Sequence, residues 1–175
     1  PPDPAPATYD LDAQLEDFGK LVGYDLAPVA NADTFVEPLT VPFENTYGVG
    51  QAIGLNMYYR ALRDGRPTDP DWRVWIHLVD PATGGTVAQL DVQPLAGMLK
   101  QYPAINREPH PVREWHQGEL VAGIYNFPLP PDLKPGKYRL ETGMWVPPNG
   151  PGATIRLESA NQPTDGIVLA EIEVR

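Results

Sequence analysis

The chain has no cysteine, no long apolar run and few basic residues, and each shortage excludes a class of protein. Without cysteine, no disulfide can cross-link the fold and no thiol can act as a nucleophile or a zinc ligand. No apolar run approaches the roughly 18 residues of a membrane-spanning helix, so we predict no transmembrane segment. With 13 Lys and Arg against 23 Asp and Glu, the net charge is -10, which argues against nucleic acid and anionic membranes as partners.

What the chain does contain indicates a single domain rich in turns. It has 175 residues, of which 22 are proline and 16 are glycine, while hydrophobic residues make up 42%. Proline and glycine favour turns, and a chain of this length with this apolar content can bury a core. We therefore predict one domain built from short elements.

The acidic residues are concentrated near the N-terminus, after a start that is rich in proline. Residues 1–45 contain nine Asp or Glu and one Lys, so they hold -8 of the net charge of -10. We predict a proline-rich acidic arm over residues 1–17 and a single β-sandwich domain over residues 18–175. The arm is either a solvated lead-in or a segment with its own partner. Apolar residues at three-residue spacing near residues 11–20 fit a short helix or an irregular lead-in.

Short segments of alternating apolar residues predict β-strands along the rest of the chain. The clearest are residues 52–62, 72–80, 86–92, 120–129, 137–146 and 167–174, with weaker ones at 21–26, 35–42 and 153–157. About eight short strands separated by turn residues predict an all-β fold, an immunoglobulin-like antiparallel β-sandwich. Residues 133–138 lead into a strand as a tyrosine corner does, which predicts that the Tyr138 hydroxyl bonds to upstream backbone.

Four aromatic residues are the candidate binding residues of this chain. Trp75 and Trp145 alternate away from the predicted core faces of their strands, while Tyr102 and Trp115 lie in a long connection over residues 94–118. Flat aromatic faces on a sandwich can hold sugar rings or a protein partner. Alternatively, the long connection covers a sheet and these rings form a second small core.

No residue pattern predicts catalysis. The chain lacks a Gly-x-Ser-x-Gly elbow, a phosphate-binding loop and a dinucleotide fingerprint. His77 lies in the middle of a predicted strand, where it is a general base, part of a ligand surface or a packed strand residue. A remote alternative is a glycoside-processing enzyme, which needs two carboxylates facing each other in a cleft. We predict that the protein is not an enzyme.

Two groups of residues contain side chains of the types that bind metal ions. Glu108, His110, Glu114 and His116 are close together in a proline-rich loop, but their spacing is irregular for a transition metal. Asp64, Asp69 and Asp71 offer oxygens, but no EF-hand pattern follows them and turn formation explains them. We predict no metal and no cofactor.

Several segments match one family in order and spacing: residues 18–26 (FGKLVGYDL), 75–80 (WIHLVD), 86–89 (TVAQ), 102–103 (YP), 115–121 (WHQGELV) and 129–140 (LPPDLKPGKYRL). The chain in this way resembles the extracytoplasmic β-sandwich domains of multi-spanning bacterial membrane glycosyltransferases of the dolichyl-phosphate-mannose mannosyltransferase type. The resemblance implies a non-catalytic sandwich on the outer side of the cell envelope. Residues 106–113 depart from it and look like an insertion.

The sequence therefore predicts a non-catalytic, extracytoplasmic structural or interaction module of the cell envelope. We expect it to dock on a protein partner or on copies of itself through the N-terminal arm and the sheet edges. The alternative function is carbohydrate binding through Trp75, Tyr102, Trp115 and Trp145.

Overall fold

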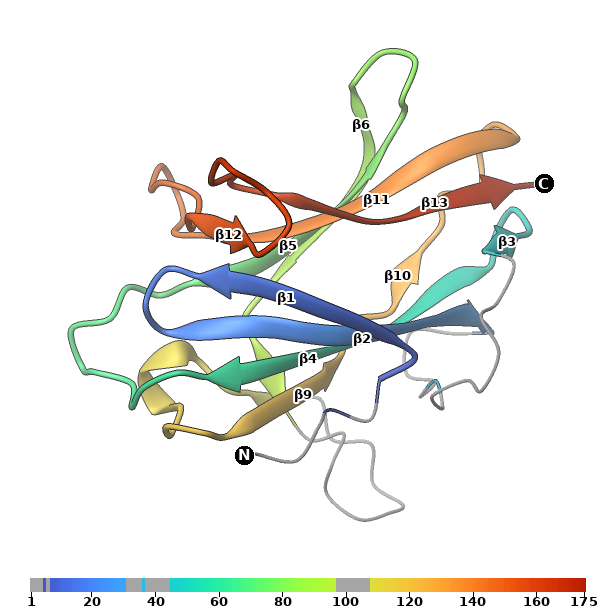
Figure 1. Cartoon of the computed structure of the whole chain (residues 1–175). Coiled ribbons are helices and arrows are strands. Elements are labelled where there is room, and N and C mark those ends of the chain that lie inside the picture. The colour runs from blue at the N-terminus through green and yellow to red at the C-terminus, as the bar shows by residue number, and fades with distance from the viewer. Residues whose placement is uncertain (1–4, 6, 31–35, 37–44, 97–107) are drawn as a thin grey trace.

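Two β-sheets lie face to face in the computed structural model, which describes residues 5, 7–30, 36, 45–96 and 108–175 (Figure 1). The larger sheet contains β1 (Tyr9–Leu15), β2 (Gly19–Val29), β4 (Ala52–Ala61), β9 (Leu120–Ile124), β10 (Phe127–Pro128) and β12 (Ile155–Leu157). The smaller sheet contains β3 (Thr46–Tyr47), β5 (Arg73–Val79), β6 (Thr86–Val92), β11 (Gly136–Trp145) and β13 (Ile167–Val174). The short pair β7 (Leu95–Ala96) and β8 (Glu108–Pro109) and the 3-10 helix η1 (Val112–Glu114) complete the described elements.

The strands follow the order β10-β4-β2-β1-β12 in the larger sheet, with β9 also beside β4, and β3-β13-β11-β5-β6 in the smaller sheet. The long pairs are antiparallel, whereas β3 runs parallel to β13. The predicted all-β sandwich is therefore confirmed, and the immunoglobulin-like strand order stays a prediction. No helix in the described part of the chain is long and apolar enough to cross a membrane.

The core lies between the two sheets because the strands alternate apolar side chains inward. In β5, Val74, Ile76 and Leu78 are fully buried, whereas Trp75 and His77 between them face outward and are half-buried. The burial of each such aliphatic side chain contributes about 1.5–3 kcal/mol to folding. The same alternation in β11 leaves the outer face of the smaller sheet free for other contacts.

Residues 11–20 form neither of the two predicted alternatives, a short helix or an irregular lead-in. Residues 9–15 are β1, which pairs with β2 on one side and β12 on the other. The three-residue spacing arises because Leu15 ends β1, Phe18 lies in the turn and Leu21 lies in β2, and all three side chains are 2% exposed in the core. The turn is tight enough to need a positive φ of 45° at Glu16. The predicted boundary at residue 18 thus lies after the first strand.

A buried polar cluster attaches the segment before β1 to the larger sheet. The Asp25 carboxylate is fully buried and accepts hydrogen bonds from the Thr8 amide (2.6 Å), the Tyr58 hydroxyl (2.6 Å) and the Asn56 side-chain amide (3.1 Å). Burial raises the pKa of Tyr58, which keeps this hydroxyl protonated as a donor. Residues 1–4 and 6 of the predicted arm, like most of the weak strand expected at 35–42, lie outside the described residues.

The predicted tyrosine corner is confirmed. The Tyr138 hydroxyl donates a hydrogen bond of 2.7 Å to the backbone carbonyl of Lys134. The Tyr138 side chain is 7% exposed, so this bond joins the core to the turn that precedes β11. The corner holds the start of β11, a strand that forms part of the outer face of the smaller sheet.

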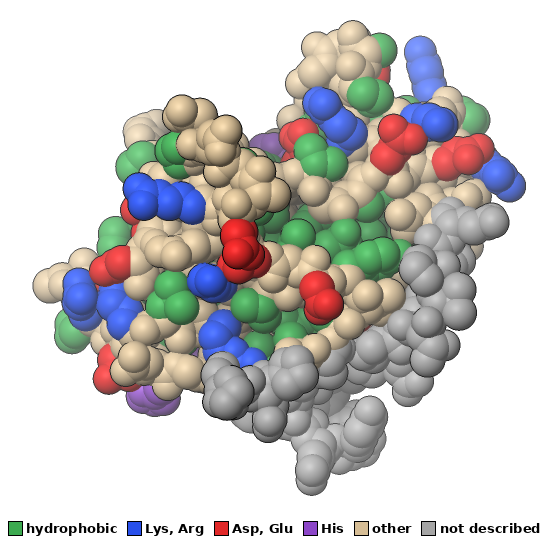
Figure 2. All heavy atoms as spheres, in the orientation of Figure 1, with side chains coloured by type: hydrophobic (Ala, Val, Ile, Leu, Met, Phe, Trp, Pro, Cys, Tyr) green, Lys and Arg blue, Asp and Glu red, His purple; other side chains and the backbone are tan. Residues whose placement is uncertain are grey.

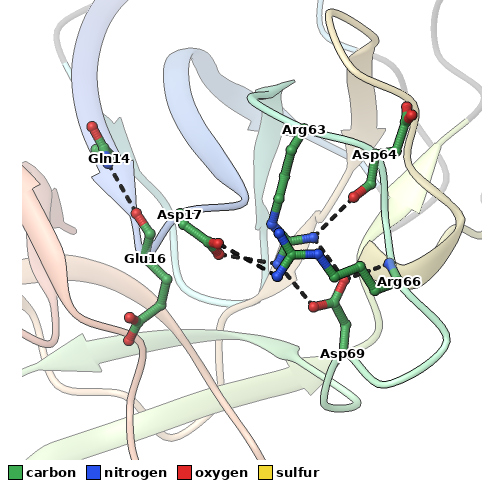
Figure 3. A network of polar contacts seen from close by, with 7 residues as sticks. All are labelled: Gln14, Glu16, Asp17, Arg63, Asp64, Arg66 and Asp69. Carbon is green, nitrogen blue, oxygen red and sulfur yellow. Dashed lines mark hydrogen bonds and ion pairs between the residues drawn. The ribbon is translucent and has the colours of Figure 1, made fainter.

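Arg63 joins two loops at one end of the sandwich (Figure 3). Its guanidinium forms two parallel bonds to the Asp69 carboxylate, of 2.8 and 2.9 Å, and a third of 3.0 Å to Asp17. These bonds lower the pKa of Asp69, because the guanidinium stabilises the ionised carboxylate. The turn between β1 and β2 is thereby tied to the loop that follows β4.

One side of the sandwich is bordered by two short strands, β12 and β3. β12 pairs with β1 only at residues 13–15, and β3 pairs with β13 only at residues 173–174. Figure 2 shows hydrophobic side chains at the centre of this side, between β1 and β13. The predicted docking of a partner through the sheet edges stays a prediction.

Candidate functional site

The outer face of the smaller sheet holds a cleft of about 430 Å³. Its side chains come from β5, β6, β11 and the segment before β13: Trp75, His77, Gln89, Asp91, Trp145 and Asp165. The backbone of Gly150 and Gly152 forms another part of its wall. Two aromatic rings, two carboxylates, an amide and an imidazole therefore meet in one place.

The register of three adjacent strands brings these side chains together. Trp75 pairs with Asp91 of β6 on one side and with Gly143 of β11 on the other. His77 pairs in the same way with Gln89 and with Glu141, which places a second row of polar side chains beside the first. Side chains of paired residues lie on the same face of a sheet, so these rows face outward with Trp75.

Two glycines hold the ring of Trp75 against the sheet. A Cβ atom on Gly143 would lie 2.6 Å from Cζ2 of Trp75, and one on Gly166 would lie 2.7 Å from its Cη2. The benzene ring of the indole therefore occupies the space that side chains would fill at both positions. The ring therefore packs closely over the backbone at both glycines, and Trp75 stays half-buried on the outer face.

His77 packs against Trp75 as a neutral ring. The two ring centroids are 4.5 Å apart and the planes are tilted by 38°. Partial burial lowers the pKa of His77 below its usual value of 6.5, although the charges of Asp91 and Glu141 oppose this shift. At neutral pH the imidazole thus has one nitrogen that donates and one that accepts a hydrogen bond.

The two carboxylates of the cleft are available to a ligand. Asp91 and Asp165 are exposed, and the one bond assigned to the Asp91 carboxylate is long, at 3.4 Å from Gln89. The indole nitrogen of Trp145 is buried and has no acceptor within the described ranges. The arrangement can stack a flat ligand on Trp75 and exchange hydrogen bonds with groups on the ligand's rim.

The structure places three of the four predicted aromatic residues, and these lie in two separate places. Trp75 and Trp145 line the cleft together. Trp115 is 1% exposed, its ring centroid is 5.9 Å from those of Phe18 and Tyr59, and its indole nitrogen donates to the carbonyl of His110. Its ring therefore belongs to the core and closes the end of the sandwich. Tyr102 lies outside the described residues.

The sequence analysis did not single out Gln89, Asp91 and Asp165, which line the cleft, or Gly143 and Gly166, against which the Trp75 ring packs. The hairpin of β5 and β6 could have indicated Gln89 and Asp91, because its register places them opposite His77 and Trp75. Asp165 and Gly166 come from a distant segment, and no local signal connects them to Trp75.

The loop residues weighed as metal ligands have protein partners instead. His110 Nε2 lies 2.8 Å from the Glu119 carboxylate, whose other oxygen accepts a bond from the backbone amide of His116. Glu114 is 3.9 Å from His110 on the opposite side of the ring. The described ranges contain no group of three or more His, Cys, Asp or Glu that could hold a metal ion.

The three aspartates weighed as calcium ligands are engaged as well. Asp69 is bound by Arg63 (Figure 3), and Asp71 accepts two bonds from Arg73, of 2.8 and 3.1 Å. Asp64 accepts a bond of 2.8 Å from the backbone amide of Gln117. These contacts connect loops and give each carboxylate a structural partner.

No protein-family model matches the chain, and no curated protein matches it. Among solved structures, the chain is similar to the crystal structure of the C-terminal domain of Wzt, with a TM-score of 0.53 and 14% sequence identity. The match covers 97% of this chain and 81% of that chain. At this identity the likeness shows a shared fold.

This match corrects two expectations. The resemblance to extracytoplasmic domains of membrane glycosyltransferases is wrong, since the structural match is to the C-terminal domain of Wzt. The expected extracytoplasmic location rested on that resemblance and is also wrong. The matching segments are strand and turn patterns, which many sandwiches share.

Proposed function

We propose that this chain is a carbohydrate-binding domain and that its ligand stacks on Trp75 in the cleft of the smaller sheet. The observation that carries the proposal is the flat ring of Trp75, seated over Gly143 and Gly166 beside Trp145. A sugar ring presents C–H groups on its faces and hydroxyl groups around its rim. Aromatic rings bind the faces, while carboxylates and amides bind the rim.

The fold supports the same proposal. Wzt is the ATP-binding component of an O-antigen ABC transporter, and its C-terminal domain is a candidate binder of that carbohydrate. We infer that this chain serves in the same general way, as an accessory domain that binds a glycan. That it does not catalyse a reaction remains a prediction, in keeping with the accessory role of the domain that it resembles.

The proposal predicts that glycan binding depends on the cleft tryptophans. Trp75→Ala removes the stacking surface, so we expect a loss of affinity of about 5- to 150-fold, since stacking on an aromatic side chain contributes on the order of 1–3 kcal/mol. Trp145→Ala should also weaken glycan binding. The measurement is a glycan array followed by titration calorimetry with the best oligosaccharide.

The matched control is Val49→Ala, which trims a side chain that is 41% exposed at the other end of the smaller sheet. This variant should bind glycan as the unchanged protein does. Glycan binding that survives in both tryptophan variants, or its absence from the unchanged protein, would overturn the proposal.

A further inference from the structure

The cleft around Trp75 is acidic. Asp91 and Asp165 line it, and none of its lining residues is Lys or Arg. Resting on the proposed function, we propose that the cleft selects neutral sugars and amino sugars and rejects sugars that carry a carboxylate or a phosphate. The observation behind this inference differs from the one behind glycan binding itself, since it concerns charge and not the aromatic surface.

Two arginines on the neighbouring strands already have carboxylate partners. Arg73 pairs with Trp145 across the strands, but its guanidinium is bound to Asp71 at 2.8 and 3.1 Å. Arg139 lies 3.6 Å from Glu141, the acidic residue beside His77. Each arginine already has a carboxylate partner, so a bound anion would have to compete for it.

His77 does not supply a positive charge at neutral pH either. Burial lowers the pKa of this imidazole below 6.5, so the ring is neutral at pH 7. It can exchange hydrogen bonds with a hydroxyl group but does not attract an anion. The charge that a ligand meets in the cleft at neutral pH is therefore that of Asp91 and Asp165.

Each class of sugar meets this environment differently. The two carboxylates have acceptors to offer and no donor, which suits the hydroxyl groups of a neutral sugar and the ammonium group of an amino sugar. An ammonium group also gains from the face of a tryptophan ring. A uronic acid or a sugar phosphate brings a like charge next to Asp91 or Asp165, and unpaired like charges in an interface oppose binding.

The test uses the whole chain on a glycan array that carries neutral, amino and uronic-acid oligosaccharides with matched ring stereochemistry. We expect binding to neutral or amino members, with the matched uronic-acid members at least about tenfold weaker. The double variant Asp91→Asn/Asp165→Asn keeps the shape and removes the charge, so it should lose most of this discrimination. Added salt should narrow the difference in the unchanged protein, because it screens exposed charges.

Two failures can be told apart. If uronic-acid or phosphorylated glycans bind as tightly as neutral ones, and Trp75→Ala abolishes that binding, the charge selectivity is wrong and the proposed function stands. If no glycan of any class binds in a way that depends on Trp75, the proposed function is wrong and the selectivity with it. An unchanged discrimination in the double asparagine variant would contradict the role given to Asp91 and Asp165.

Discussion

At the residue scale, the cleft depends on the absence of a side chain at two positions. Gly143 and Gly166 have no side chain, and the ring of Trp75 fills the space above them. The position of Trp75 on the outer face follows from the alternation of β5 and is predictable from the sequence. The support under its ring is not, because it requires the pairing of β11 with β5 and the return of the chain before β13.

The seat of Trp75 can be tested by adding one methyl group. In Gly166→Ala the new Cβ would lie 2.7 and 2.9 Å from two atoms of the Trp75 ring, while the nearest other atom is a backbone oxygen at 3.7 Å. The ring should tilt off the sheet, and glycan affinity should fall several-fold while the melting temperature changes little. A variant that binds glycan as tightly as the unchanged protein would contradict the role given to this ring.

The titration of His77 predicts a dependence of stability on pH. Because its pKa is lowered in the folded protein, the unfolded chain takes up a proton first as pH falls below 6.5. The contribution of His77 to stability is therefore present above pH 6.5 and declines as pH falls towards its folded pKa. His77→Gln removes the pH-dependent contribution of this imidazole to stability and leaves the other titrating groups in place.

Denaturant unfolding at pH 7.5 and pH 5.5 measures how the contribution of His77 to the free energy of unfolding changes with pH. The fall in unfolding free energy between the two values should be smaller in His77→Gln than in the unchanged protein. An equal fall in both would show that the environment of His77 does not disfavour its charged form.

At the scale of elements, the positions of most strands can be predicted from the sequence, whereas the pairing of the strands cannot. Residues 86–92 and 167–174 were predicted as strands from alternation, and β6 and β13 have these bounds. The strand at the start of residues 11–20 is not predictable from the spacing, because a strand, a tight turn and the next strand space three core residues as a helix would. Alternation reports which face is buried, whereas the order of strands depends on contacts between distant segments.

The tyrosine corner before β11 gives a prediction for an element. Tyr138→Phe keeps the ring and removes the hydroxyl that bonds to the Lys134 carbonyl. We expect a loss of about 1 kcal/mol of unfolding free energy, the usual net worth of such a hydrogen bond. Chemical denaturation measures it with Val49→Ala as the control, and a variant as stable as the unchanged protein would show that the bond adds nothing.

At the scale of the whole molecule, the fold and the family must be kept apart. The strand and turn patterns predicted a two-sheet sandwich, and this is what the chain forms. The same patterns also suggested a family of extracytoplasmic domains, and there they failed, because turns and alternation are common to unrelated sandwiches. The function that we propose therefore rests on the cleft, with the likeness to the Wzt domain as support.

The four tryptophans allow the most direct test of that function. Trp75 and Trp145 line the cleft, whereas Trp72 and Trp115 are 7% and 1% exposed in the core. In a nitrogen-15 NMR titration with the best oligosaccharide from the array, the indole signals of Trp75 and Trp145 should shift. Those of Trp72 and Trp115 should stay in place. Shifts confined to the core pair, or no shift at all, would contradict the account.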